Sequence, residues 1–274
     1  MPKNDLNVTL KGIDELLFST EEQRQEEKRE QVQQIPIDEL HPFTNHPFKV
    51  VDDEAMTRTV ESIAQFGVLA PLIARPRPDG DGYEIISGHR RQYAAKLAGL
   101  ETLPVIVRDM DDDAATILMV DSNLQREHIS PSERAFAYKM KLDAMRRQAG
   151  RPSKENGVPL GHHFQQGKSR EILADNSPDS NTQIQRYIRL TNLIPEILDM
   201  VDDGRIAFRP AVELSYLTEQ EQSALYDTMG REDCTPSLAQ AIKMKAFSRD
   251  GKLTDAVILS IMEEEKPNQK EQFR

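Results

Sequence analysis

Cysteine, tryptophan and long apolar runs are what this chain has least of. Its 274 residues include one cysteine, Cys234, no tryptophan and only 5% aromatic residues. A single cysteine excludes a disulfide within the chain and a metal site built from several cysteines. No apolar run approaches the ~18 residues of a membrane span, and the N-terminus has no signal-peptide core. These absences predict a cytoplasmic protein with no membrane partner, long enough for one large or two modest domains.

Negative charge dominates the chain, but basic residues gather in one region. The net charge is −11, yet residues 134–191 contain eleven Lys or Arg and five Asp or Glu. That region therefore carries +6 and the rest of the chain −17. Such an asymmetry is typical of a DNA-binding module on an acidic protein, with chance clustering as the alternative.

The most informative stretch is Tyr83–Leu100, where a short apolar run turns at Gly88 into a helix closed by Gly99. Arg90 and Arg91 lie in the first turn of that helix. A glycine turn before a helix offers free backbone N–H groups and the positive end of the helix dipole, which suit an anion. Two guanidinium groups there favour phosphate. Taken alone, the stretch is equally compatible with an ordinary strand–turn–helix corner.

Short strands mixed with helices predict an α+β fold. Residues 1–34 are polar and charged and are expected to form a flexible arm, with a partner-binding arm as the alternative. Ordered structure is expected to begin at 35–37 and to pass through a proline-rich loop. Strands are expected at 71–75, 83–87 and 103–107.

Capping signals predict where the helices begin and end. A helix is expected to start after Asp52 or Asp53 and to end at Gly67. The acidic residues 109–113 match no calcium loop and are expected to cap the next helix. Residues 130–133 form a capping box that opens a long helix. The basic residues of that helix are expected to fall mostly off its apolar face: Lys139, Lys141, Arg146 and Arg147.

Residues 169–190 predict a short helix, a tight turn and a second helix with Ile184 and Ile188 facing inward. Asn, Gln and Arg at the start of such a helix read base edges in a major groove. An ordinary α-hairpin with a polar face is the alternative. The candidate DNA-binding residues are Lys168, Arg170, Ser180, Asn181, Thr182, Gln183, Gln185, Arg186 and Arg189.

Three motifs, in this order, resemble those of the ParB/RepB family of DNA-partition proteins. The first is Gly67–Leu72. The second is Ser87–Leu100, followed by Pro104–Arg108. The third is Asn123–Glu127, followed by a helix after Ser130-Pro131. The resemblance covers roughly residues 35–215.

The resemblance implies a sulfiredoxin-like mixed α/β domain that binds CTP, followed by an all-α helix-turn-helix domain that recognises a palindromic, centromere-like DNA site. It also implies closure of a homodimer into a DNA clamp, and a ParA-type ATPase partner engaged by the N-terminal arm. The protein would then be nucleoid-associated in the cytoplasm. The implied domains are 1–34, the arm; 35–128, nucleotide binding; 129–247, helix-turn-helix; and 248–274, a short helix and tail. The implied nucleotide-binding residues are Gly67, Pro71, Ser87, Gly88, His89, Arg90, Arg91, Asn123, Gln125 and Arg126.

The third motif departs from the family at its metal site. Ser122 stands where the family usually has a Glu that helps to hold Mg²⁺, next to the candidate ligand Asn123. Asp121 or Glu127 would have to replace that carboxylate. Because a lost carboxylate weakens a site for a hard cation, CTP binding is expected ahead of CTP hydrolysis, which stays open as an alternative.

Other departures affect the second motif, the turn and the end of the chain. His89 stands where Glu is common, and Ser177 and Pro178 replace an apolar residue and a Gly in the helix-turn-helix. After Phe247 only 27 residues follow, too few for the family's separate dimerisation domain. The expectation is a truncated chain, or dimerisation through the N-terminal and middle domains.

Two further functions fit the same sequence. One is a transcriptional regulator or nucleoid-occlusion-type adaptor on the same scaffold. The other is an enzyme with a sulfiredoxin-like fold, but that redox chemistry needs a catalytic cysteine, and Cys234 lies far along the chain from Gly88.

Overall fold

The computed structural model describes residues 31–44, 46–48, 50, 52–78, 80–126, 129–150, 173–174 and 177–264. These residues divide into two compact units. The first lies within Met1–Phe43 and Val51–Asp109, and the second within Thr44–Val50 and Met110–Arg274. The first is mixed α/β and the second helical, so the α+β prediction is confirmed.

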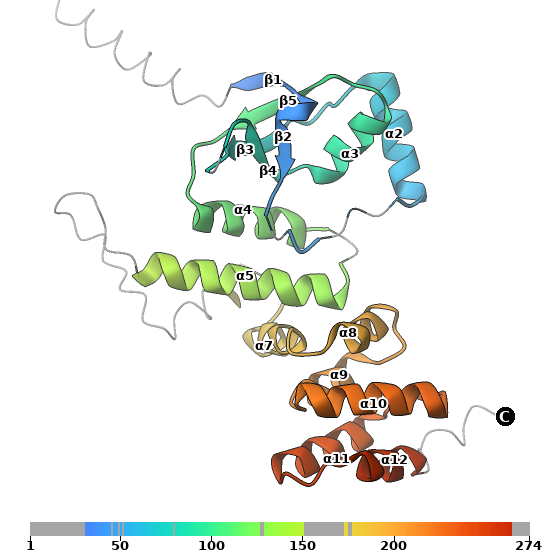
Figure 1. Ribbon diagram of the computed structural model, residues 1–274. Helices are drawn as coiled ribbons and strands as arrows, with labels where there is room; N and C mark the ends of the chain where they lie inside the picture. The colour runs from blue at the N-terminus through green and yellow to red at the C-terminus, as the bar shows by residue number, and fades with distance from the viewer. Residues whose placement is uncertain are drawn as a thin grey trace, which may run out of the picture. The chain divides into compact units, whose positions relative to one another are not determined.

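A five-stranded sheet with the order β1-β5-β3-β4-β2 forms the centre of the first unit (Figure 1). The pairs β1/β5 and β3/β4 are antiparallel, and β3/β5 and β2/β4 are parallel. The strands are β1 (Val32–Pro36), β2 (Leu40–Pro42), β3 (Leu72–Pro76), β4 (Tyr83–Ser87) and β5 (Thr102–Val107).

The strands predicted near 71–75, 83–87 and 103–107 are confirmed. Two strands were not foreseen: β1, whose residues 32–34 fall within the predicted flexible arm, and β2. Strand β2 follows a short 3₁₀ helix, η1 (Ile37–Glu39), where a proline-rich loop was predicted. Proline has no N–H to donate to a ladder, and β2 is an edge strand with a single neighbour. Pro42 is therefore tolerated at its end.

Two helices, α2 (Glu54–Phe66) and α3 (His89–Leu97), pack against each other and share a core with the sheet (Figure 1). Asp53 is the residue that caps α2, because its Oδ1 accepts a hydrogen bond from Met56 N at 2.8 Å. Gly67, with φ of 70°, ends the helix as predicted. Fully buried side chains from both helices and the sheet fill this core: Met56, Leu72, Ile85, Ala94 and Val105.

The described part of the second unit is built from helices. In Figure 1, α4 lies along α5, which in turn packs on α7. A common aliphatic core joins the helices from α5 onward. The helices are α4 (Asp112–Leu124), α5 (Pro131–Gly150), α7 (Asn181–Leu190), α8 (Pro195–Asp202), α9 (Phe208–Leu214), α10 (Glu219–Glu232), α11 (Leu238–Arg249) and α12 (Asp255–Glu263). No helix within the described residues is long and apolar enough to cross a bilayer.

The predicted caps of this unit are confirmed. Asp111 caps α4 by accepting from Ala114 N at 2.8 Å. Ser130 and Glu133 form the reciprocal capping box of α5, each backbone N–H donating to the other side chain at 3.2 Å. One expectation for α5 is wrong: Lys141 is buried rather than off the apolar face, with 3% of its surface exposed. It turns toward α4, where a carboxylate pairs with it.

Candidate nucleotide and DNA sites

Gly88 makes the corner between β4 and α3. Its φ of 112° lies in the region that favours glycine, and a Cβ there would lie 2.7 Å from Leu72 Cγ. The chain can turn sharply at this point and start α3 at His89 without a side-chain cap. The first backbone N–H groups of α3 therefore point out of the corner with no partner inside the helix, an arrangement that suits an anion.

Arg90 is held loosely beside this corner. Its Nη2 lies 3.2 Å from Asp53 Oδ1, and both side chains are partly exposed, at 30% and 47%. The Met56 N–H, and after it the Arg90 guanidinium, hold the pKa of Asp53 below its usual range. An anion at the start of α3 would compete with Asp53 for Arg90. Sequence reasoning treated Asp53 only as a cap and missed this pairing, because the two residues are 37 positions apart.

Arg91 has a different role from Arg90. Its Nη1 donates to the carbonyl oxygens of Ala70 at 2.5 Å and Pro71 at 2.9 Å. Burial lowers the pKa of Arg91. The side chain fixes the first motif, which runs from the end of α2 at Gly67 to β3, onto the second motif. Two of the recognised motifs thus meet through one arginine.

The remaining first-unit candidates contribute mainly backbone. The His89 ring is buried, and its Nε2 accepts from Phe43 N at 3.4 Å, so the ring anchors the segment after β2. Ser87 is the last residue of β4 and pairs with Ile73 of β3. The buried His89 ring therefore presents no exposed face to a phosphate.

The third motif belongs to the second unit, at the end of α4. Asn123 is buried, and its Nδ2 donates to Met119 O at 2.7 Å. Gln125 is exposed at the C-cap. The guanidinium of Arg126 lies over the ring of Phe48, 5.4 Å from its centre, within cation–π range.

Among the residues that the structure describes, those around Asn123 do not fit a Mg²⁺ ion held by the protein. Mg²⁺ is usually bound by one or two carboxylates together with phosphate oxygens. The carboxylate of Asp121 pairs with Lys141, and the Ser122 hydroxyl donates to Met119 O at 3.0 Å. Glu127 lies outside the described residues. Within the described parts of the chain, no group of three His, Cys, Asp or Glu side chains is arranged to hold a metal.

The helix predicted to read DNA is α7. Ser180 caps it, with its Oγ accepting from Gln183 N at 3.3 Å. Ile184 is fully buried, as predicted, and Ile188 is half-buried. The side chains left exposed at its N-terminal half include Asn181, Thr182 and Arg186, whereas Gln183 and Gln185 are half-buried.

The prediction that Arg189 faces outward with them is wrong. Its Nη2 donates to Ser215 O at 2.8 Å, and its guanidinium lies 3.9 Å from the centre of the Tyr216 ring. Lys245 lies at 3.6 Å from the same ring centre. Arg189 therefore ties the end of α7 to the residues that follow α9.

The turn before α7 is only partly described. Lys168 and Arg170 lie outside the described residues. Leu173 is fully buried, and the Ser177 hydroxyl donates to its carbonyl oxygen at 2.5 Å. The hydroxyl in place of the family's apolar residue thus closes the turn by a hydrogen bond.

A set of buried polar contacts anchors the start of α7 on α5. The carboxylate of Asp179 accepts from Tyr138 Oη at 2.7 Å and from Arg134 Nη1 at 3.3 Å. Burial, and after it the bond to Asp179, raise the pKa of Tyr138. Arg134 also lies over the ring of Tyr187, 5.3 Å from its centre. Sequence reasoning missed this anchor, because its partners are more than 40 positions apart.

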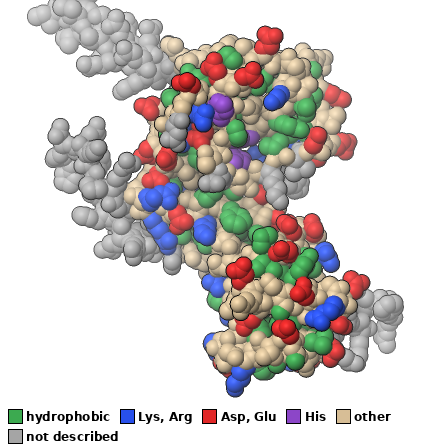
Figure 2. All heavy atoms as spheres, in the orientation of Figure 1, with side chains coloured by type: hydrophobic (Ala, Val, Ile, Leu, Met, Phe, Trp, Pro, Cys, Tyr) green, Lys and Arg blue, Asp and Glu red, His purple; other side chains and the backbone are tan. Residues whose placement is uncertain are grey.

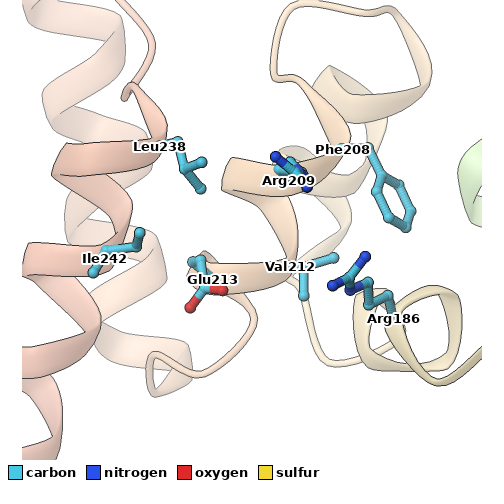
Figure 3. A pocket seen from close by; sticks show the side chains of 7 residues that line it. All are labelled: Arg186, Phe208, Arg209, Val212, Glu213, Leu238 and Ile242. Atoms are coloured by element: carbon cyan, nitrogen blue, oxygen red, sulfur yellow. The ribbon is translucent and has the colours of Figure 1, made fainter. Parts of the chain in front are cut away.

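A half-open pocket of about 200 Å³ lies between α7, α9 and α11 (Figure 3). Its polar lining comes from Arg186 of α7 together with Arg209 and Glu213 of α9. The apolar lining consists of Phe208, Val212, Leu238 and Ile242. Arg209 is thus a second arginine beside the predicted DNA-reading face, and only the packing of α9 on α7 reveals it.

Comparison with known proteins defines the class. A sequence model described as ParB N-terminal domain matches residues 21–124. The chain is 30% identical over 220 residues to the probable chromosome 1-partitioning protein ParB of Deinococcus radiodurans, covering 80% of this chain and 68% of that protein. It is also 30% identical to the nucleoid occlusion protein of Listeria monocytogenes, with coverages of 76% and 68%. The chain belongs to the ParB family.

The coverage of the relatives is partial. Three further relatives, two named as chromosome-partitioning proteins and one as a stage 0 sporulation protein, are 27–34% identical and are matched over 55–65% of their length. A crystal structure of C-terminally truncated ParB from Caulobacter crescentus, complexed to the centromeric parS site, matches 80% of this chain and 99% of that one. At 23% identity and a TM-score of 0.45, that similarity supports no conclusion about this chain.

Proposed function

We propose that this chain is a ParB-type centromere-binding protein. It binds a specific palindromic DNA site and CTP, and it forms a homodimeric clamp on DNA during partition of a plasmid or chromosome. Residues 35–128 serve as the nucleotide-binding domain and residues 129–247 as the helix-turn-helix domain. Residues 1–34 engage a ParA-type ATPase, and the protein is associated with the nucleoid.

The observation that carries the DNA-binding part is the face of α7 in a chain of this family. Asn181, Thr182 and Arg186 are exposed together at the N-terminal half of a helix whose opposite side is buried at Ile184. These are the side chains that pair with base edges in a major groove. In Figure 2, Lys and Arg side chains gather on the visible face of the second unit at the level of α5, and Asp and Glu side chains are scattered over both units.

The CTP-binding part rests on the Gly88 corner. The open N-terminus of α3, the partly exposed Arg90 and the first motif held by Arg91 provide N–H groups and positive charge for a triphosphate. The names of the Deinococcus and Listeria relatives refer to chromosome partition and nucleoid occlusion. Both processes act on DNA.

The DNA part is tested by selecting duplexes from a random pool and measuring the affinity of the enriched sequence by fluorescence anisotropy. One palindrome is expected to be enriched. Arg186→Ala should weaken binding to it by about 1–3 kcal/mol while changing non-specific binding much less. Arg189→Ala is the matched control, because its guanidinium is occupied by Ser215 and Tyr216; its ratio of specific to non-specific affinity should stay as in wild type.

The CTP part is tested by calorimetry with CTP and, as the competing nucleotide, ATP. The wild-type protein is expected to bind CTP and not ATP, and the Arg90→Ala variant is expected to lose CTP binding. A protein that enriches no DNA sequence and releases no heat with CTP is not a ParB-type clamp.

A second function, a nucleoid-occlusion-type adaptor or transcriptional regulator, is favoured by one observation, the 30% identity to the Listeria nucleoid occlusion protein. Both functions need the DNA-reading face of α7, so DNA selection alone does not separate them. Mapping of the enriched site in the host genome does: a site clustered at one locus supports partition, and sites dispersed along the chromosome support the adaptor.

A further inference from the structure

The end of α4 is where the family resemblance places a Mg²⁺ ligand, and the side chains there are already engaged. Ser122 stands in place of the expected Glu, and its hydroxyl donates to Met119 O at 3.0 Å. The Asn123 amide donates to the same carbonyl at 2.7 Å. Both residues supply only neutral oxygens, whereas a hard cation such as Mg²⁺ is usually held by at least one carboxylate.

Asp121 lies two positions before Asn123 near the end of α4, and its carboxylate pairs with a buried cation. Lys141 Nζ of α5 lies 2.5 Å from Asp121 Oδ1. The Lys141 side chain is 4% exposed and the Asp121 side chain 43%. A buried ammonium group is tolerated only when it is paired, so turning Asp121 toward a metal would leave Lys141 as a lone buried charge.

The position of Lys141 explains why this pair is fixed. It lies on the face of α5 that packs along α4, between the fully buried Tyr138 and Ala144. A second ion pair, Arg147 Nε to Asp113 Oδ1 at 2.7 Å, joins the same two helices. The Asp121 carboxylate is therefore engaged in the contact between α4 and α5. It is not available to bind a metal ion.

We infer that this chain binds its nucleotide without a Mg²⁺ ion held by the protein, and that Lys141 maintains this state by occupying Asp121. The inference rests on the proposed CTP binding. It specifies which groups of the protein contact the phosphates of the nucleotide. The phosphates are met by the Arg90 guanidinium and by the open N–H groups of α3, neither of which needs a metal. Lys141 is a positioning residue that acts through Asp121.

The test is calorimetry of the full chain with CTP, in excess MgCl₂ and in excess EDTA. Wild type is expected to bind CTP in both buffers with Kd values within about threefold of each other. Ser122→Glu supplies the missing carboxylate and is expected to bind CTP at least about tenfold more tightly in MgCl₂ than in EDTA. Ser122→Ala is the matched control and should show the wild-type insensitivity to Mg²⁺.

The double variant Asp121→Asn with Lys141→Met tests directly whether Asp121 serves as a metal ligand. It removes both charges at once, so that no lone charge is buried and the α4–α5 packing is retained. Its two Kd values are expected to match those of wild type. A weaker Kd in MgCl₂ with an unchanged Kd in EDTA would identify Asp121 as a metal ligand and overturn the inference.

The outcomes for wild type separate the inference from the function on which it rests. Binding of CTP that requires MgCl₂ overturns the inference and leaves CTP binding standing. An absence of CTP binding in both buffers overturns both.

Discussion

At the scale of single residues, Gly88 has two separate reasons to be glycine. Its φ of 112° disfavours any side chain, and a Cβ would meet Leu72 Cγ at 2.7 Å. Gly99, at the other end of α3, has a φ of 76° but open space around the position of a Cβ. Substitutions at the two glycines therefore separate the free-energy cost of the backbone conformation from the cost of steric crowding by a Cβ.

Gly99→Ala is expected to lower the free energy of unfolding by about 1–2 kcal/mol, the cost of a left-handed residue with a Cβ. Gly88→Ala is expected to cost about 1–3 kcal/mol more, because Leu72 in the core must also shift. Urea unfolding followed by circular dichroism measures both. Equal losses for the two variants would show that the Leu72 contact relaxes freely.

At the scale of helices, α5 is the element on which the second unit depends. It packs along α4, carries the Tyr138 and Arg134 partners of Asp179 at the start of α7, and is tied to α8. The tie to α8 is made by Asp202, which accepts from both the backbone N and the hydroxyl of Ser132. The orientation of α7, the helix proposed to read DNA, thus depends on side chains of α5 that lie outside the proposed DNA-reading face.

Asp179→Ala and Tyr138→Phe test this anchor. Tyr138→Phe removes one hydrogen bond and leaves Asp179 paired with Arg134, so a loss of about 0.5–1.5 kcal/mol in unfolding free energy is expected. Asp179→Ala removes the carboxylate that accepts from the buried Tyr138 hydroxyl and pairs with Arg134, and should cost about 1–3 kcal/mol. Thermal unfolding measures stability, and anisotropy measures DNA affinity. If Asp179→Ala kept wild-type affinity for the selected site, the anchor would have no part in presenting α7.

At the scale of the whole chain, a net charge of −11 coexists with a basic region of +6 between residues 134 and 191. Binding to DNA by such a chain depends on local Lys and Arg contacts with phosphates, which release counterions. The rest of the chain repels DNA, and salt screens that repulsion together with the attraction.

The logarithm of the DNA association constant is expected to fall linearly with the logarithm of salt concentration. Arg186→Ala should reduce that slope by about 0.9 if Arg186 contacts a phosphate, and should leave it unchanged if Arg186 contacts only a base. Arg189→Ala should leave the slope unchanged, because Arg189 is turned to Ser215. Anisotropy titrations over a series of KCl concentrations give the slopes. A slope changed by Arg189→Ala would contradict its assignment as a structural residue.

The sequence by itself determined the local features. Helix caps at Asp111 and at Ser130 with Glu133 were readable because a cap and its partner lie three residues apart. The Gly88 corner and the inward side of α7 were readable for the same reason, since turn chemistry and helical periodicity are local.

Only the tertiary structure decided which charged side chains are free to meet a ligand. Arg90 and Arg91 are neighbours in sequence, yet one meets Asp53 and the other the carbonyls of Ala70 and Pro71. Lys141 looked like a solvated basic residue and is buried against Asp121, and Arg189 looked like a DNA contact and is held by Ser215. In each case the partner lies 20 or more positions away, so the outcome depends on how helices and loops pack and not on any local pattern.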